Sequence, residues 1–331
     1  MRKAIIYGTG SYYEQNGGRL PKDMEIVAYA DSNLNNVTSH NGKLFRGLPM
    51  LLPEELGAVT YDVVYICTDY GVGNRIFQRL SQAGISSDRI FFLNRMEPTI
   101  DWKYEATEDR KGYLSTIDGI TIKERYLTDF DIVDEVLIEH SYGFGFEDVE
   151  CVAIDIGMNV GIASLYFAKQ PGVKKVYGFE AFPDTYEQAV ANIALNSPGI
   201  GDKIEAMNFA LSDKNGRKMV AVCSEETGWR NIFSKDKNKR QVEIECRDAG
   251  GTVKDIIDNH NEKIVLKIDT EGAEFQIFAA LDRAGCFEKI NVIMMEYHGD
   301  SEKLVLVLKK YGYRYFIHGK KKVCGVIYAV K

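Results

Sequence analysis

The sequence predicts an α/β protein with two domains, each built on a mostly parallel sheet. Two stretches of the chain alternate short apolar runs with helical patterns, which is typical of parallel strands joined by crossover helices. With 331 residues, 45% of them hydrophobic, the chain can bury two cores. We therefore expect a smaller domain at residues 1–97, a connecting segment at 98–147 and a larger domain at 148–331.

The first domain has the pattern of a small doubly wound unit. Four apolar runs predict strands, at residues 4–7, 25–30, 62–67 and 90–93. Between the last two strands, Ile76, Leu80 and Ala83 recur at helical spacing, and Gly84 stands where a helix C-cap belongs. The connecting segment that follows is charged and aromatic, with a hairpin expected around Asp118 and a helix near residues 132–139.

A glycine turn follows the first strand. Residues 8–10 read Gly-Thr-Gly, and Asp31 comes 21 residues after Gly10, as in a dinucleotide-binding turn. Tyr13 occupies the place of the third glycine, which in such turns lets the helix pack closely against the strand. A nicotinamide site in this domain therefore stays an alternative and is not the favoured interpretation.

The second domain repeats the alternation. Strands are predicted at residues 151–154, 176–179, 204–210, 264–268 and 292–295, and helices at 162–168, 184–196, 253–259 and 274–284. Asp184 and Glu187 have the spacing of a capping box, and Ser301 is expected to cap a last helix. The chain closes with a predicted hairpin of residues 313–317 and 323–330, which would add an antiparallel edge to the sheet.

Composition excludes several classes of function. A net charge of -7 with only short basic runs argues against a nucleic-acid surface. The six cysteines have no metal-type spacing and indicate reduced, mostly buried packing residues, so no metal is expected. The N-terminus lacks a signal-peptide pattern and no apolar stretch is long enough for a membrane span, so we expect a cytoplasmic protein.

The second domain contains the segment with the clearest chemistry. Residues 152–161 are an apolar strand that runs into a glycine turn opening a helix, where a ligand can approach the backbone closely. Asp155 lies at the entrance of this turn and would repel the pyrophosphate of a dinucleotide. A carboxylate there suits a cationic ligand, and S-adenosylmethionine carries both an ammonium and a sulfonium group. The charge pattern favours this methyl donor.

Acidic residues end three further strands. Glu180 follows the second strand, where a carboxylate commonly accepts hydrogen bonds from ribose hydroxyls. Asp269 and Glu296 follow the fourth and fifth strands. Because ligands bind beyond the carboxyl ends of the strands in open α/β sheets, we expect these residues and Asp155 to converge on one crevice.

In this order the motifs of residues 149–331 resemble the FkbM-type methyltransferases. The matching pieces are Asp155-Ile156-Gly157-Met158-Asn159-Val160-Gly161, Phe179-Glu180-Ala181-Phe182-Pro183, Ala210-Leu211-Ser212-Asp213-Lys214-Asn215-Gly216, Lys267-Ile268-Asp269-Thr270-Glu271-Gly272-Ala273-Glu274 and Glu296-Tyr297-His298. The resemblance implies a seven-stranded Rossmann-like methyltransferase sheet, S-adenosylmethionine as the donor, and a hydroxyl of a sugar, glycan or natural product as the acceptor. The family commonly has Glu-Pro directly after the second strand, whereas two residues separate Glu180 from Pro183 here.

The motifs also indicate site residues. The donor would be bound by Asp155, Gly157, Asn159, Gly161, Glu180, Ala181, Ala210 and Asp269. Asp269, Glu271 and His298 are candidates for the base that takes a proton from the acceptor hydroxyl, with Asp269 first. A single histidine after a strand is as often structural as catalytic. The loop at residues 227–234, with Trp229 and Arg230, is a further candidate for acceptor contact.

The first domain resembles the Rossmann-type accessory domains of nucleotide-sugar and surface-glycan enzymes. It could hold a nucleotide-linked acceptor, mediate a homodimer or only extend the fold. Two other classes of function stay open: an NAD(P)-dependent oxidoreductase acting through residues 1–97, and a non-catalytic nucleotide- or glycan-binding protein. The acceptor itself, a sugar or polyketide hydroxyl, a lipid-linked glycan or an amine, is not distinguished by residues that bind only the donor.

Overall fold

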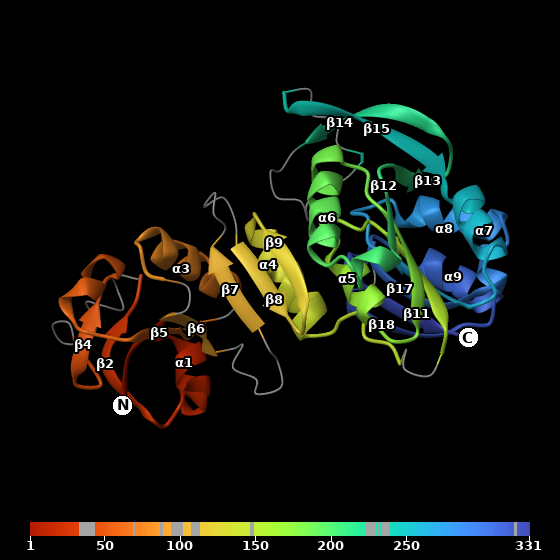
Figure 1. Ribbon diagram of the computed structural model, residues 1–331. Helices are drawn as coiled ribbons and strands as arrows, with labels where there is room; N and C mark the ends of the chain where they lie inside the picture. The colour runs from red at the N-terminus through yellow and green to blue at the C-terminus, as the bar shows by residue number, and fades with distance from the viewer. Residues whose placement is uncertain are drawn as a thin grey trace. The chain divides into compact units, whose positions relative to one another are not determined.

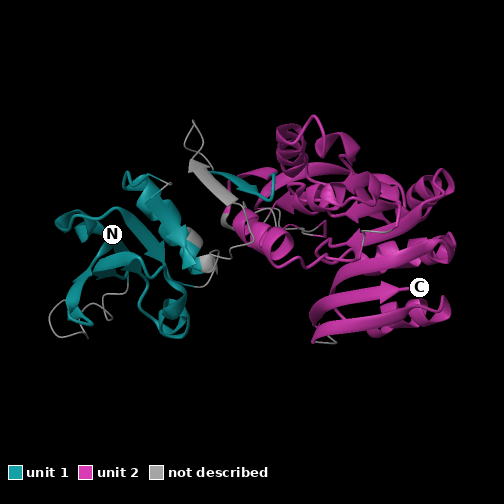
Figure 2. Cartoon of the chain, turned by 60° about the horizontal axis from the view of Figure 1, so that its bottom comes forward, with its two compact units in different colours: residues 1–119 teal, residues 120–331 magenta. Residues whose placement is uncertain are grey.

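The computed structural model divides the chain into two compact units, residues 1–119 and 120–331 (Figures 1 and 2). It describes residues 1–32, 44–68, 70–86, 89–93, 102–106, 113–145, 149–222, 230, 232–233, 238–320 and 323–331. The division falls inside the expected connecting segment, at the turn between β8 (Tyr113–Ile117) and β9 (Ile120–Glu124). Asp118 and Gly119 both have positive φ in this turn, 48° and 79°, as a two-residue hairpin requires.

Unit 1 is a doubly wound α/β unit, as predicted. Its sheet has the order β3-β4-β2-β1-β5-β6 and is parallel except for the β3–β4 pair. The strands are β1 (Arg2–Tyr7), β2 (Met24–Ala30), β3 (Leu44–Phe45), β4 (Leu48–Leu51), β5 (Val63–Ile66) and β6 (Ile90–Phe92). The predicted helix is α3 (Tyr70–Gln82), and Gly84 follows it with a φ of 89°.

The glycine turn of unit 1 is closed by its own side chains. Asp31 accepts hydrogen bonds from the Thr9 backbone N–H and hydroxyl, at 3.4 and 3.1 Å. The helix that follows, α1 (Ser11–Asn16), has only six residues. Tyr13 is buried at the place of the missing glycine, with its hydroxyl 3.0 Å from that of Tyr29. The bulky side chain therefore fills the space that a third glycine would leave open.

Unit 2 contains a seven-stranded sheet in the order β12-β11-β10-β16-β17-β19-β18. Its parallel strands are β10 (Cys151–Ile156), β11 (Val173–Phe179), β12 (Ile204–Met207), β16 (Lys263–Ile268) and β17 (Ile290–His298). The hairpin of β18 (Arg314–Lys320) and β19 (Cys324–Val330) adds two strands, and β19 runs antiparallel to β17. The predicted mostly parallel sheet with an antiparallel edge is confirmed.

Helices cover both faces of this sheet (Figure 1). They are α5 (Ile162–Lys169) and α6 (Pro183–Leu195) on one face, and α7 (Ala249–Asp258), α8 (Glu274–Arg283) and α9 (Glu302–Lys310) on the other. The larger core forms where alternate residues of β10 and β16, such as Ile154 and Leu266, pack with α7 and α8. In register, Ile156 lies opposite both Phe179 and Ile268, so three strands end at the same level and their loops meet there.

Two local predictions were wrong. The strand expected at residues 204–210 is two strands, because β13 (Ala210–Ser212) leaves the main sheet and joins β14 (Gly216–Val222) and β15 (Arg240–Asp248). The capping box is absent, since α6 has Phe182 as its N-cap and Pro183 in its first position. The Asp184 carboxylate instead pairs with Arg230 and Arg240, both at 2.8 Å. Ser301 occupies the N-cap position of α9, but its side chain makes no capping hydrogen bond.

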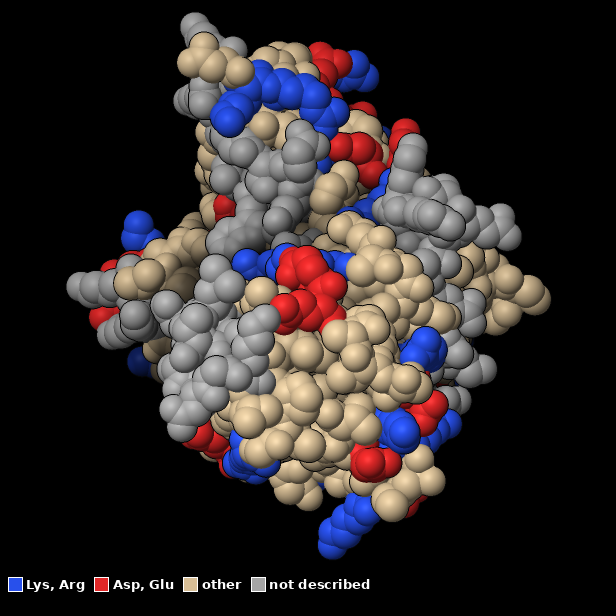
Figure 3. Space-filling view, turned by 90° about the vertical axis from the view of Figure 1, so that its left-hand side faces the viewer, with Lys and Arg blue, Asp and Glu red and all other residues tan. Residues whose placement is uncertain are grey.

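The described part of the chain has mostly buried cysteines and a surface of mixed charge. The five cysteines among them are free thiols, and only Cys324 is exposed. None of the helices that the structure describes is long and apolar enough to span a bilayer. On the face shown in Figure 3, acidic and basic side chains are interspersed between larger uncharged areas.

Candidate active site

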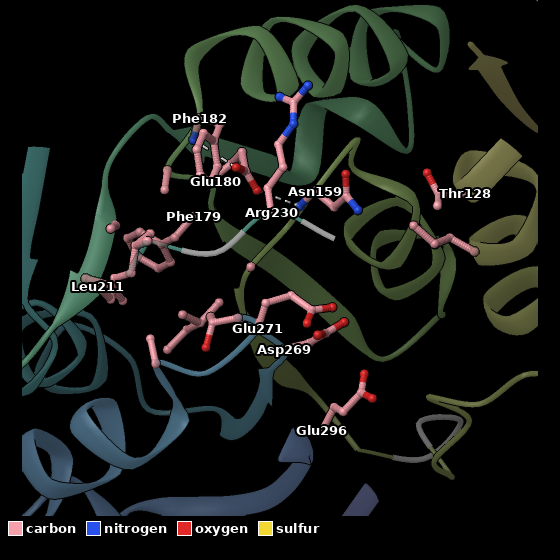
Figure 4. A pocket seen from close by; sticks show the side chains of 18 of the residues that line it. Thr128, Asn159, Phe179, Glu180, Phe182, Leu211, Arg230, Asp269, Glu271 and Glu296 are labelled. Carbon is pink, nitrogen blue, oxygen red and sulfur yellow. Dashed lines mark hydrogen bonds between the residues drawn. The ribbon is translucent and has the colours of Figure 1, made fainter. Parts of the chain in front are cut away.

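A cavity of about 240 Å³ opens in unit 2 at the carboxyl ends of β10, β11, β16 and β17 (Figure 4). Its lining residues are Thr128, Asp131, Ile132, Glu135, Ile156, Gly157, Asn159, Phe179, Glu180, Ala181, Phe182, Phe209, Ala210, Leu211, Arg230, Ile232, Asp269, Thr270, Glu271, Ala273 and Glu296. One side of the cavity is apolar and aromatic, and another is acidic. The two kinds of wall suit a ligand with an aromatic part and a cationic part.

The glycine turn after β10 forms the floor of the cavity. Gly157 has a φ of 81°, and a side chain there would overlap the backbone carbonyl oxygen of Asp269. Asn159 and Gly161 also have positive φ, 52° and 90°, and Gly161 is the N-cap of α5. Only a residue without Cβ lets the two loops approach this closely, so the backbone itself lines the cavity at this point.

Glu180 is held beside the turn by two backbone amides. Its Oε2 accepts a hydrogen bond from the Asn159 N–H at 3.0 Å, and its Oε1 accepts one from the Phe182 N–H at 2.9 Å. Burial raises the pKa of Glu180 to about 7, although both hydrogen bonds act in the opposite direction. Each carboxylate oxygen keeps a further lone pair, so the side chain can still accept hydrogen bonds from hydroxyl groups in the cavity.

Asp155 does not occupy the place that its charge suggested. Its side chain is fully buried and does not line the cavity. The carboxylate accepts a hydrogen bond from the Ser164 hydroxyl at 2.7 Å and lies 3.0 Å from Lys267 Nζ. A buried carboxylate needs such partners, because desolvation without them is costly. The argument that Asp155 attracts a ligand cation directly is therefore corrected: Lys267 takes up its charge.

Lys267 connects this buried pair to the turn. Its Nζ donates a hydrogen bond to the Gly157 carbonyl oxygen at 2.6 Å and lies 3.7 Å from Asp269 Oδ2. Burial lowers the pKa of Lys267, but the neighbouring carboxylates of Asp155 and Asp269 outweigh it and raise the pKa above its ordinary value. Asp155 thus supports the glycine turn from beneath, through a lysine that stays charged.

The acidic wall is formed by Asp269, Glu271 and Glu296, which lie together opposite Asn159 and Glu180 (Figure 4). Burial, with the nearby charge of Asp269, raises the pKa of Glu271 to about 6 and that of Glu296 to about 7. Both shifts come first from burial, which makes the charged form of each glutamate less favourable, and the charge of Asp269 adds to this effect. The wall therefore favours a positively charged group or a bound proton.

His298 lies behind this wall and is not among the lining residues. Its Nδ1 is 3.3 Å from Glu274 Oε1, and its Nε2 is 3.4 Å from Glu271 Oε2. The hydrogen bond with Glu274 and the surrounding carboxylates raise the pKa of His298 to about 9, against the effect of burial. A ring that is protonated at neutral pH cannot accept a proton, so the structure argues against His298 as the general base.

The structure therefore separates the predicted site residues into two groups. Those that line the cavity are Gly157, Asn159, Glu180, Ala181, Ala210, Asp269 and Glu271. Those that do not are Asp155, Gly161 and His298, which position the turn and the wall. Glu296 also lines the cavity, as the convergence of strand ends predicted. Among the described residues, no group of three or more His, Cys, Asp or Glu side chains is arranged to hold a metal ion.

Sequence reasoning missed one wall of the cavity altogether. Thr128, Asp131, Ile132 and Glu135 come from α4 (Leu127–Val133) and the π-helical turn η5 (Asp134–Ile138) that continues it. The helix predicted at residues 132–139 includes Ile132 and Glu135, but it was assigned to the connecting segment and given no role in the site. A π-helical turn inside a helix often marks a functional site, yet sequence periodicity does not reveal it.

Arg230 was considered only as part of a loop. Its side chain is 2% exposed and donates hydrogen bonds to Asp184 Oδ1 at 2.8 Å and to the Thr185 hydroxyl at 3.0 Å. It also lies over the Phe182 ring, 5.7 Å from the centroid. Arg230 thus fastens its loop to the start of α6 beside the cavity. Trp229 and the other residues of the loop at 227–229, 231 and 234 lie outside the described residues.

Comparison with known proteins points to the same part of the chain. Residues 155–315 match the methyltransferase FkbM domain family, and residues 1–91 match the family described as C2185-like, N-terminal. Methyltransferase sdnD of Sordaria araneosa is 26% identical over 178 residues, which cover 46% of this chain and 68% of that protein. The region 155–315 includes the glycine turn, Glu180 and the acidic wall.

Two further similarities cover more of the chain at lower identity. The AMB antimetabolite synthetase AmbE of Pseudomonas aeruginosa is 21% identical over 276 residues, 70% of this chain but 12% of that protein. The crystal structure of methyltransferase FkbM from Methylobacillus flagellatus aligns with 99% of this chain and 90% of its own, at 14% identity and a TM-score of 0.39.

Proposed function

We propose that unit 2, whose residues 155–315 match the methyltransferase FkbM domain family, is a methyltransferase domain. It transfers a methyl group from S-adenosylmethionine to a hydroxyl oxygen of a small-molecule or glycan acceptor. The observation that carries the proposal is the position of Glu180. Its carboxylate is fixed between the Asn159 and Phe182 amides, beside a glycine turn and inside an aromatic-lined cavity.

Several features of the cavity fit this donor. Glu180 offers acceptors for two ribose hydroxyls, and Phe182 and Phe209 provide apolar surface for a nucleobase. The side-chain oxygen of Asn159 is buried without a hydrogen-bond partner among the described residues, and a ligand amine could supply one. Gly157 leaves the floor free of side chains, so a ligand can contact the backbone.

The charge of the cavity supports the sulfonium donor over a dinucleotide. Asp269, Glu271 and Glu296 line the wall, and the charge of Asp269 adds to the effect of burial, which raises the pKa values of the two glutamates. A pyrophosphate would add further negative charge at this wall, whereas an ammonium or sulfonium group would be stabilised by it. This argument replaces the one based on Asp155, which is buried and paired.

In the proposed reaction, the donor supplies an electrophilic methyl carbon. The acceptor oxygen forms the new bond to this carbon as the carbon–sulfur bond breaks, and the hydroxyl proton passes to a carboxylate of the acidic wall. Asp269 is the first candidate for that base, because it lies on the wall, 30% exposed at its side chain. Glu296 is the second, since a pKa of about 7 suits a base that works near neutral pH. The protein contributes mainly alignment of the two reactants.

Isothermal titration calorimetry of the full chain with S-adenosylmethionine and S-adenosylhomocysteine tests the donor. We expect binding in the micromolar range, at least tenfold weaker in Glu180→Ala, and no competition by NAD or NADP. Wild-type protein that does not bind at millimolar donor would overturn the proposal. Labelled donor with a panel of sugars, nucleotide sugars and glycans then identifies the acceptor by transfer of label.

Calorimetry with reduced nicotinamide cofactor, together with the labelled-donor assay, separates the two other classes of function. Reduced nicotinamide cofactor bound by residues 1–97 would favour an oxidoreductase. A non-catalytic binding protein would bind the donor but transfer no label to any acceptor of the panel. It would also not convert the donor slowly to S-adenosylhomocysteine in the absence of an acceptor. In unit 1, the Thr9 backbone N–H and hydroxyl both donate to Asp31 Oδ2, so they use part of the acceptor capacity of the carboxylate that a ribose would contact.

A further inference from the structure

We infer that His298 is a positioning residue that acts as a fixed cation: its two ring nitrogens tie Glu271, on the cavity wall, to Glu274, beneath it. The inference rests on the proposed function, because it assigns a task to a residue behind that same wall. It replaces the role of proton acceptor that the sequence suggested for this histidine.

Glu274 is the anchor of this arrangement. It begins α8, and its side chain has no exposed surface. Its Oε1 accepts hydrogen bonds from the Gly272 N–H at 2.8 Å and from the Thr270 hydroxyl at 3.3 Å, and it faces His298 Nδ1. A buried carboxylate with these contacts keeps a defined position, so it fixes both the 270–272 loop and the imidazole ring.

The ring carries its second nitrogen toward the cavity wall. Nε2 lies 3.4 Å from Glu271 Oε2 and 3.8 Å from Glu296 Oε1. Carboxylates therefore face both nitrogens, and a neutral imidazole has only one N–H, so it could donate to only one of them. The doubly protonated ring satisfies Glu271 and Glu274 together. A pKa raised to about 9 agrees with this geometry.

Charged groups on other elements also change the pKa values of the two glutamates on the wall. Asp269, on the loop after β16, raises the pKa values of Glu271 and Glu296, whereas His298 lowers both. Glu135 of η5 acts on Glu296 in the same direction as Asp269. Lys267, the other cation near the wall, is 3.0 Å from Asp155 and so is already paired. His298 is thus the positive charge that directly contacts the glutamates of the wall among the described residues.

The backbone of Glu271 shows why such a tie is needed. Its φ is 53°, in the left-handed region, which is unfavourable for a residue with a side chain. Gly272 follows with a φ of 113°. Residues in such conformations persist where the surroundings determine them. Two contacts hold the loop in this conformation. Glu274 accepts a hydrogen bond from Gly272, and His298 contacts the Glu271 side chain.

Nuclear magnetic resonance titration of ¹⁵N-histidine-labelled full-length protein tests the inference without donor or acceptor. We expect the His298 ring, assigned by loss of its signal in His298→Gln, to stay doubly protonated to at least pH 8. In Glu274→Gln its proton dissociation constant should increase at least tenfold. Glu205→Gln, at the far edge strand β12, is the control and should leave it unchanged. A wild-type ring that titrates near pH 6.5 would overturn the inference.

Two further measurements keep the test decisive. If Glu274→Gln does not fold, Glu271→Gln should produce a smaller shift in the same direction, and no shift there would count against the tie. In His298→Gln, ¹³C-carboxyl titration should show Glu271 and Glu296 protonated at higher pH than in the wild type, which a purely structural histidine would not cause. Loss of donor binding by the wild type would overturn the proposed function but not these titrations.

Discussion

Replacing Gly157 by alanine tests the geometry of the glycine turn directly. The added Cβ would overlap the carbonyl oxygen of Asp269, so either the turn or the loop after β16 has to move by on the order of 1 Å. The φ of 81° costs an alanine about 1–2 kcal/mol. The overlap adds about 1–3 kcal/mol, the usual cost of overpacking. Because both loops line the cavity, we expect donor affinity to fall at least about tenfold, or 1.4 kcal/mol.

Gly285→Ala is the matched control. Gly285 has a similar φ, 72°, but a Cβ there would meet nothing within 4 Å, so it carries the backbone cost without the overlap. Thermal unfolding should place Gly157→Ala several degrees below Gly285→Ala, given roughly 2–4 °C per kcal/mol for a domain of this size. Calorimetry with S-adenosylmethionine should show near wild-type affinity for the control alone. Equal melting temperatures and equal affinities in the two variants would refute the reasoning.

Four further outcomes are expected. Because Glu180 accepts hydroxyl hydrogen bonds best when ionised and its pKa is about 7, donor affinity should rise from pH 6 to pH 8, and Glu180→Gln should abolish this rise. Because the pKa of Glu180 is higher in the folded than in the unfolded protein, Glu180 contributes stability below about pH 4.5 that is lost as the pH rises through about 7. The difference in melting temperature between the wild type and Glu180→Gln should therefore depend on pH. Lys267→Met leaves the buried Asp155 carboxylate unpaired and should destabilise unit 2 by about 3–5 kcal/mol in denaturant unfolding, with more than half recovered in Asp155→Asn/Lys267→Met. Asp269→Asn should lower turnover at saturating donor at least about 100-fold; normal turnover at saturating donor would exclude Asp269 as the base.

The architecture could be predicted because its signals are local. Apolar runs mark the strands of both sheets, and a glycine after the first strand of unit 2 marks the turn. Since parallel strands end at a common edge, the convergence of Glu180, Asp269 and Glu296 followed from their positions after strands. What the pattern could not show was where the chain leaves the main sheet, as after β12, because a single polar residue, Asn208, between two apolar runs does not distinguish one strand from two.

The errors in the site share one physical cause. A residue's place at a strand end gives its level in the sheet but not which neighbour neutralises it. Asp155 pairs with Lys267 across two adjacent strands, where the register places these two residues opposite each other. Glu271 and Glu274, more than twenty residues earlier, face the two ring nitrogens of His298, and these carboxylates raise the pKa of His298 to about 9. Pairings between distant segments decide charge, and a single sequence does not display them.

The helical wall of α4 and η5 determines where the protein can be truncated without damage to the cavity. Only the short strand β9 separates the Asp118–Gly119 turn from α4, and Asp129 ties the start of that helix to the end of β9 through the Arg125 N–H at 2.8 Å. Gln188 of α6 holds the same carboxylate at 2.9 Å. A truncation that starts at residue 148 would remove this wall and strip α6 of its partner. An expression boundary for the catalytic half therefore belongs ahead of residue 120.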